Sequence, residues 1–150
     1  WQDYMLLKVK NTNMKTTSSK KVYTFAVGRR KSSSARVRLF KGPGESLING
    51  KKISEIYENK IAALVLNRPF KITSTEGKFF FTAKVAGGGK EGQMEAIVHG
   101  VSRALVKLDP EKFRVTLKKN NLLTRDSRVR LRRMVGTGGK ARRQKQSPKR

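Results

Sequence analysis

The stretch GGGKEG at residues 87–92 comes nearest, in this sequence, to a known chemical site. Its glycines match the G-x-G-x-x-G pattern, in which a loop between a strand and a helix holds the pyrophosphate of a dinucleotide. That site also needs a second strand after the helix, ending in an acidic residue for the ribose. Here LDPEKF, more helical sequence and a basic end follow, so the sequence argues against a dinucleotide fold. An RNA phosphate would suit the loop equally, since glycine lets a backbone approach a ligand and a helix N-terminus favours anions. The candidate phosphate ligands are Gly87, Gly88, Gly89 and Lys90.

The second candidate is GRRKSSSARVRL, residues 28–39, a basic and hydroxyl-rich segment that joins two expected strands. A loop of this kind can offer guanidinium groups, an ammonium, hydroxyls and backbone N–H groups to phosphates together. A solvated, mobile loop is the alternative, and the net charge of +26 weighs against it. The candidate ligands in this segment are Arg29, Arg30, Lys31, Ser32, Ser33 and Arg36.

His99 is the only histidine, and the chain has no cysteine. A zinc site needs several such ligands, so no metal is expected. Catalysis by His99 would need a nucleophile and an orienting carboxylate, and nothing in the sequence marks either. We expect a packed or hydrogen-bonded helix residue, and a chain that is not an enzyme and uses no cofactor. The run Phe79–Phe81 could stack on bases, but a strand buried on both faces explains it more simply.

The charge balance, 36 Lys and Arg against 10 Asp and Glu, calls for a polyanionic partner. The excess lies toward the ends, because residues 4–44 and 127–150 contain no acidic residue. No apolar run approaches the roughly 20 residues of a membrane span, so no membrane contact is expected.

The elements that must position these residues mix strands and helices without strict alternation. Strands are expected at 22–27, 35–40, 46–50, 70–74 and 78–85.

A short helix capped by Ser54 should reach Leu66 and end before Pro69. A long helix follows the glycine loop, with an apolar stripe made of Met94, Ile97, Val98, Val101, Leu105 and Leu108. Another helix begins at Pro110 and runs to about Asn120. The fold class is therefore α+β, a split α/β sandwich with a sheet backed by helices.

Three regions follow from composition: a flexible arm at 1–20, a globular domain at 21–124 and an extended basic tail at 125–150. The end of the tail, VGTGGKARRQKQSPKR, removes too little apolar surface from water to fold on itself. The release of counterions from a nucleic acid backbone favours the binding of such a basic segment along it. The candidate RNA ligands of the tail are Arg125, Arg128, Arg130, Arg132, Arg133, Lys140, Arg142 and Arg143.

Several separated motifs occur together in one order: GRRKSSSARVRL, ING, VAGGGKEGQMEAIVHGVSRAL, LLTRDSRVRLRR and KARRQKQSPKR. In this order they resemble the universal small-subunit ribosomal protein nine family, of bacterial or organellar type, over about residues 22–150. The resemblance implies a structural constituent of the small ribosomal subunit, bound to ribosomal RNA and neighbouring proteins in its head. It implies a bacterial cytoplasmic or organellar ribosome, and a body like the second domain of ribosomal protein five. It also implies a tail whose last residues, Lys149 and Arg150, contact peptidyl-site transfer RNA.

The tail departs from the family at two places. Ser147 and Pro148 stand where Phe and Ser are usual, which puts a stacking contact in doubt and stiffens the approach of the terminal charges. Gly138 and Gly139 stand where a basic pair is common, so the tail is looser there. Two other classes remain open: a general DNA- and RNA-compacting protein, and an enzyme of nucleotide chemistry that would bind mononucleotides.

Overall fold

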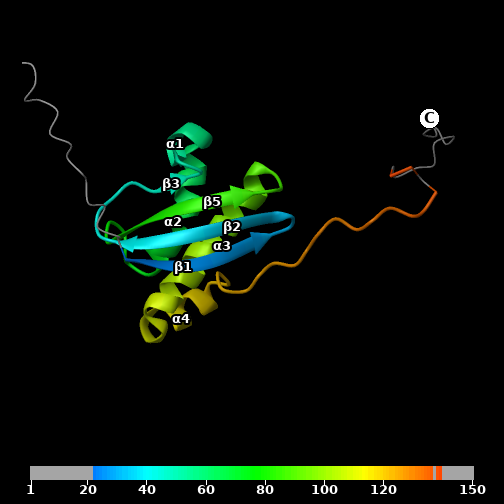
Figure 1. The fold of residues 1–150 in the computed structure, drawn as a ribbon. Helices are drawn as coiled ribbons and strands as arrows, with labels where there is room; N and C mark the ends of the chain where they lie inside the picture. The colour runs from blue at the N-terminus through cyan, green and yellow to red at the C-terminus, as the bar shows by residue number, and fades with distance from the viewer. Residues whose placement is uncertain (1–21, 137, 140–150) are drawn as a thin grey trace, which may run out of the picture.

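The computed structural model describes residues 22–136 and 138–139, and shows one sheet backed by helices (Figure 1). The strands are β1 Tyr23–Arg30, β2 Ser33–Lys41, β3 Leu47–Ile48, β4 Lys51–Lys52 and β5 Phe79–Ala86. The helices are α1 Ile53–Ile56, α2 Lys60–Ile72, α3 Lys90–Leu108 and α4 Pro110–Lys119. The sheet order is β1-β2-β5-β3-β4, with only β3 and β5 parallel. The expected α+β class is confirmed, while the expected arm at 1–20 lies outside the described residues.

The part of the basic segment that was expected to be a loop, residues 28–34, is mostly strand. β1 and β2 pair up to Arg30 and Ser33, so only Lys31 and Ser32 make the turn of a hairpin. Lys31 has a φ of 50°, the left-handed conformation that such a tight turn requires. Strand pairing extends this far because Ser33 and Ala35 are buried on the core face, which continues the alternation of β2 to its first residue.

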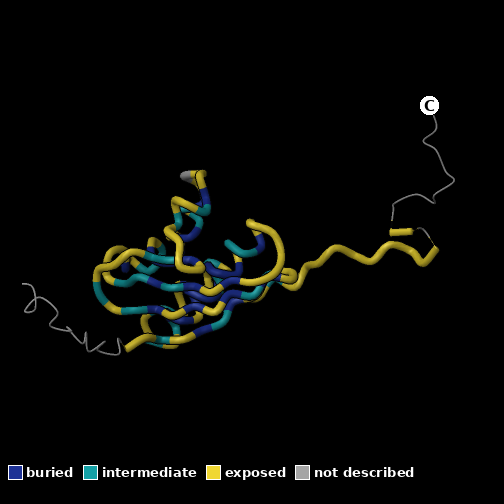
Figure 2. The backbone as a smooth tube through the Cα atoms, turned by 45° about the horizontal axis from the view of Figure 1, so that its top comes forward, coloured by how far each residue is buried: buried dark blue, intermediate teal, exposed yellow. Residues whose placement is uncertain are grey.

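The core lies between one face of the sheet and the helices, as the buried segments in Figure 2 show. The expected stripe of α3 is confirmed at its centre, where Ile97, Val101 and Leu105 are fully buried. Two glycines that face each other, Gly28 in β1 and Gly100 in α3, bring α3 unusually close to the sheet. A Cβ on Gly28 would lie 1.9 Å from the carbonyl oxygen of Ala96. In this core α3 therefore lies almost directly on β1, which fixes how its polar side chains reach the strand.

The region before β5 differs from expectation. Ser54 lies within α1 and caps no helix, α2 continues through Pro69, and the strand expected at 70–74 does not form. A proline inside a helix removes a hydrogen bond and costs about 3 kcal/mol. Here Pro69 is fully buried, and the buried ring of Phe70 stacks on Phe81 at 6.3 Å. Tertiary burial thus outweighs the local stop signal.

The three phenylalanines at the start of β5 point alternately to the two faces, as expected. Phe81 is fully buried under α2, whereas Phe80 is half-buried and stacks on Phe40 with ring centroids 5.0 Å apart. The strand is therefore covered by helices on one face only, so burial on both faces was a wrong expectation. None of the helices in the described residues is long and apolar enough to cross a membrane.

The outer edge of β1 is covered by side chains of α3. Lys107 and Arg103 donate to the carbonyl oxygens of Phe25 and Val27, the former at 3.5 Å. The N–H of Arg29 donates to Nδ1 of His99 at 3.3 Å. Since these three α3 residues recur every fourth position, they lie on one helix face and satisfy the backbone groups of an edge strand that would otherwise invite pairing.

Candidate nucleic-acid interface

The hairpin turn and the glycine loop, far apart in sequence, form one surface at the end of the sheet. The hydroxyl of Ser33 donates to the carbonyl oxygen of Gly87 at 3.1 Å, and the side chain of Gln93 donates to the same oxygen. A Cβ on Gly88 would lie 2.0 Å from the Ser33 hydroxyl, and one on Gly87 would lie 2.6 Å from the carbonyl oxygen of Ser32. The glycines are thus required for packing against the hairpin.

Most candidate ligands of these two motifs are open to solvent. The exposed members are Arg29, Lys31, Ser32, Arg36, Gly87, Gly88, Gly89 and Lys90. Ser33 and Arg30 are the exceptions. Ser33 is 2% exposed and its hydroxyl is already bonded inside the protein, and the Arg30 side chain is also largely buried. Lys90 begins α3, where unpaired backbone N–H groups favour an anion. The exposed set can therefore meet phosphates, while Ser33 shapes the turn.

Arg30 holds the base of the tail instead of facing solvent. Its guanidinium pairs with Glu95, lies 3.1 Å from Asp126 and donates to the carbonyl oxygen of Arg128 at 2.8 Å. The Arg30 side chain is only 11% exposed. A guanidinium has five N–H donors in a fixed fork, and this geometry uses them to join β1, α3 and the tail. We call these four residues the tail latch.

The carboxylate of Asp126 is the acceptor at the centre of the tail latch. The Arg128 side chain donates to both of its oxygens, and the backbone N–H of Arg128 donates to Oδ1 at 3.0 Å. These bonds, with the charges of Arg128 and Arg30, hold the pKa of Asp126 far below its ordinary value. Asp126 is therefore charged across the neutral and mildly acidic range.

His99 makes a second tie to the tail base. Its Nδ1 accepts the N–H of Arg29, so the proton of the neutral ring is on Nε2, which donates to the carbonyl oxygen of Leu123 at 3.2 Å. Burial lowers the pKa of His99, and the positive charges of Arg103 and Arg125 act in the same direction. The expected role as a hydrogen-bonded helix residue is confirmed.

Beyond the tail latch the chain leaves the sheet and helices of the body (Figure 1). Residues 127–134 form neither helix nor strand, and every residue of this segment is exposed. The segment runs away from the sheet in an extended path (Figures 1 and 2). Among the expected ligands it carries Arg128, Arg130, Arg132 and Arg133, whereas Arg125 is exposed just before it. Lys140, Arg142, Arg143, Lys149 and Arg150 lie outside the described residues.

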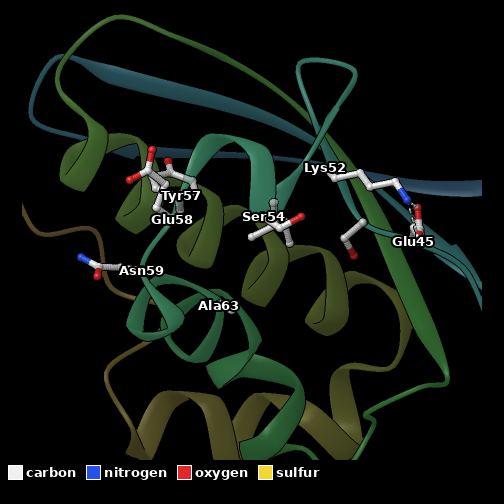
Figure 3. A pocket seen from close by; sticks show the side chains of 9 residues that line it. Glu45, Lys52, Ser54, Tyr57, Glu58, Asn59 and Ala63 are labelled. Atoms are coloured by element: carbon white, nitrogen blue, oxygen red, sulfur yellow. Dashed lines mark hydrogen bonds and ion pairs between the residues drawn. The ribbon is translucent and has the colours of Figure 1, made fainter.

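A hollow elsewhere on the molecule has a different character. A cavity of about 410 Å³ opens beside α1 and the start of α2, and is lined by Glu45, Ser54, Tyr57 and Glu58, among others. Figure 3 shows Lys52 pointing toward Glu45, to which it is bound at 2.9 Å. The carboxylates of Glu45 and Glu58, which line this cavity, repel a phosphate. The described residues hold no group of His, Cys, Asp or Glu suited to a metal. We assign this hollow no part in the interface.

Sequence reasoning treated Arg30 as a phosphate ligand and missed Glu95 as its partner. One signal was available: Asp126 is the only acidic residue after Glu111, within the otherwise basic end of the chain. An isolated carboxylate among many cations is a marker of a specific ion pair. Its partner could not be read from the sequence, because Arg30 lies in another element.

Comparison with known proteins shows what this chain is similar to. A family model described as ribosomal protein S9/S16 matches residues 28–150, a range that includes the hairpin turn, the glycine loop and the tail. A protein of Maridesulfovibrio salexigens, named small ribosomal subunit protein uS9, is 42% identical over 119 residues. The aligned residues are 79% of this chain and 91% of that protein.

Proposed function

The chain belongs to the ribosomal protein S9/S16 family, and from this premise we propose that it binds ribosomal RNA in the head of the small subunit. As a family member it is a ribosomal structural protein of the small subunit and not an enzyme. One observation carries the RNA proposal: the hairpin turn, the glycine loop and the tail base meet on one basic surface. Contacts are made mainly with phosphate and sugar, so shape is read more than base sequence.

The body and the tail have separate tasks in this proposal. The body takes the fold of the second domain of ribosomal protein five, which the single sheet with helices on one face supports. It docks on RNA and on neighbouring proteins of the head. The tail runs through RNA, since its described part is extended, basic and exposed. Its terminal residues, Lys149 and Arg150, contact peptidyl-site transfer RNA.

The RNA proposal is tested by binding the full chain to the 3′ domain of small-subunit ribosomal RNA across a range of salt concentrations. A chain that ends at Met134 and a duplex DNA competitor complete the design. Several phosphate contacts cost orders of magnitude in affinity between about 50 and 200 mM salt, and truncation should flatten this dependence. If duplex DNA competes equally, the chain is a general DNA- and RNA-compacting protein and the proposal fails.

The transfer RNA proposal needs assembled subunits. The double substitution of Lys149→Ala and Arg150→Ala should leave subunit assembly intact and weaken binding of peptidyl-site transfer RNA. A variant with Arg142→Ala and Arg143→Ala removes the same charge from the tail and is the control, expected to act on ribosomal RNA instead. Unchanged transfer RNA affinity in the terminal variant would exclude the assigned role.

A further inference from the structure

One face of the sheet has no helix on it in the described part of the chain. The buried residues of β2 are every second residue from Ser33 to Leu39. They point to the other face, where the helices lie. The open face carries the remaining side chains of β1, β2 and β5. Figure 1 shows these strands in front of α2 and α3. The strand register orders them in rows, of which one contains Val27, Arg36 and Lys84 and the next contains Phe25, Arg38 and Thr82.

The charge of this face is unbalanced. Arg36, Arg38 and Lys84 are exposed, and none of the residues in β1, β2 and β5 is acidic. Arg36 and Lys84 lie directly opposite each other in the register, and like charges in that position destabilise a sheet. Among the described residues no carboxylate pairs with any of the three. A pair of this kind is favourable when an outside anion lies across both side chains.

Three aromatic residues of this face, Tyr23, Phe40 and Phe80, contact one another, whereas Phe25 is exposed. Tyr23 and Phe40 have ring centroids 5.7 Å apart, and Phe40 stacks on Phe80 at an interplanar angle of 11°. The guanidinium of Arg38 lies 5.1 Å from the centroid of the Tyr23 ring, a cation–π contact that holds it at the surface. Because these three rings already have partners, the face offers mainly fixed positive charges, with Phe25 as an exposed ring beside Arg38.

We infer that the open face binds the phosphate backbone of RNA as a contact site that adds Arg38 and Lys84 to Arg36, the candidate ligand already named in the basic segment. The inference rests on the proposed function, since it takes the same RNA as the partner. The charge of the face favours RNA as the partner, because a phosphate backbone lying across Arg36 and Lys84 supplies the negative charge that no carboxylate of the described residues supplies. Continuity supports it, since Arg29 and Ser34 form the next row and lead to the turn.

The test compares two triple variants of the full chain on the 3′ domain RNA. Arg36→Ala, Arg38→Ala and Lys84→Ala remove three charges from the open face. Lys112→Ala, Lys118→Ala and Lys119→Ala remove three charges from exposed positions of α4, which packs on helices and not on the sheet. Each lost phosphate contact lowers the magnitude of the salt slope by about 0.7–0.9, so the first variant should lose roughly 2–3 units and the second little. Equal slopes for the two variants would overturn the inference.

Two controls separate the possible failures. If the unaltered chain does not prefer the 3′ domain RNA over duplex DNA, the proposed function fails, and the inference that rests on it fails with it. If the chain binds RNA but the open-face variant binds equally well, only the present inference fails. Thermal unfolding of each variant shows whether the sheet is intact.

A measurement without substitution addresses folding defects directly. Lys84 is exposed in the free chain and should react with an acetylating reagent there, while assembled subunits should protect it. Photochemical cross-linking of assembled subunits should then join the peptide that contains Lys84 to RNA. Cross-linking of this peptide to a neighbouring protein, or reaction of Lys84 at the free rate, would contradict RNA as the occupant.

Discussion

The guanidinium of Arg30 lies 3.1 Å from the carboxylate of Asp126, and this ion pair joins the end of β1 to the base of the tail. The same guanidinium donates to the carbonyl oxygen of Arg128, 98 positions further along the chain. The neighbouring residue, Arg29, has its side chain exposed while its backbone N–H bonds to His99. Two successive arginines of a strand point to opposite faces, so one is available to RNA and the other sets where the tail leaves the body.

Substitution of the two arginines should therefore separate RNA binding from tail position. Arg29→Ala with Lys31→Ala should weaken binding to the 3′ domain RNA and leave thermal unfolding within a few degrees, because both side chains are exposed. Arg30→Ala should instead speed amide hydrogen exchange over residues 122–128, since it removes the donors of the tail latch. Arg30→Lys keeps the charge without the fork and should restore exchange protection only in part. Unchanged exchange in Arg30→Ala would show that the tail base is held by other contacts.

Asp126 should remain charged at acid pH. A carboxylate with a lowered native pKa contributes stability that is complete above its ordinary value of 3.8 and is lost only as the pH falls through the native value. The amide resonance of Arg128, whose N–H donates to Asp126, should thus report a transition well below pH 3.8. In Asp126→Asn that transition should disappear. A midpoint near 3.8 in the unaltered chain would mean that the bonds to Arg128 do not form in solution.

His99 should make the stability of the tail base depend on pH in a higher range. Its native pKa lies below 6.5, so the contribution of the neutral ring is complete above 6.5 and declines as the pH falls below that value. Protonation places a hydrogen on Nδ1, which then no longer accepts the N–H of Arg29. Because the chain has a single histidine, its ring resonances can be followed without overlap. His99→Gln should remove this pH dependence of unfolding; its persistence in that variant would assign the effect to another group.

Two adjacent glycines of the loop before α3 should respond differently to the same substitution. Gly88 has a φ of +65° and has no room for a Cβ beside Ser33, so Gly88→Ser should lower the free energy of unfolding by at least about 1–3 kcal/mol. Gly89 has an extended backbone at the N-cap of α3 with open space around it. Serine is a favoured N-cap residue, so Gly89→Ser should leave stability unchanged or slightly raised. Denaturant unfolding of both variants checks this, and equal losses would contradict the packing of the loop on the hairpin.

The sequence by itself determined the properties that depend on residue type and near neighbours. The excess of Lys and Arg indicated a polyanionic partner, and the spacing of Ile97, Val101 and Leu105 predicted α3, because a helix stripe repeats within a few residues. The order of the motifs indicated the family that the comparison confirms. The basic segment that contains the hairpin turn and the glycine loop were both identified as candidate sites, although not as a hairpin and not as neighbours.

Tertiary structure alone decided which residues meet. Pro69 signals a helix end locally, yet the burial of Phe70 against Phe81 carries α2 past it. Arg30 looks like a phosphate ligand beside Arg29, yet its partners Glu95 and Asp126 come from α3 and the tail base. The energies that decide these outcomes come from contacts between residues distant in sequence, which the local pattern does not contain.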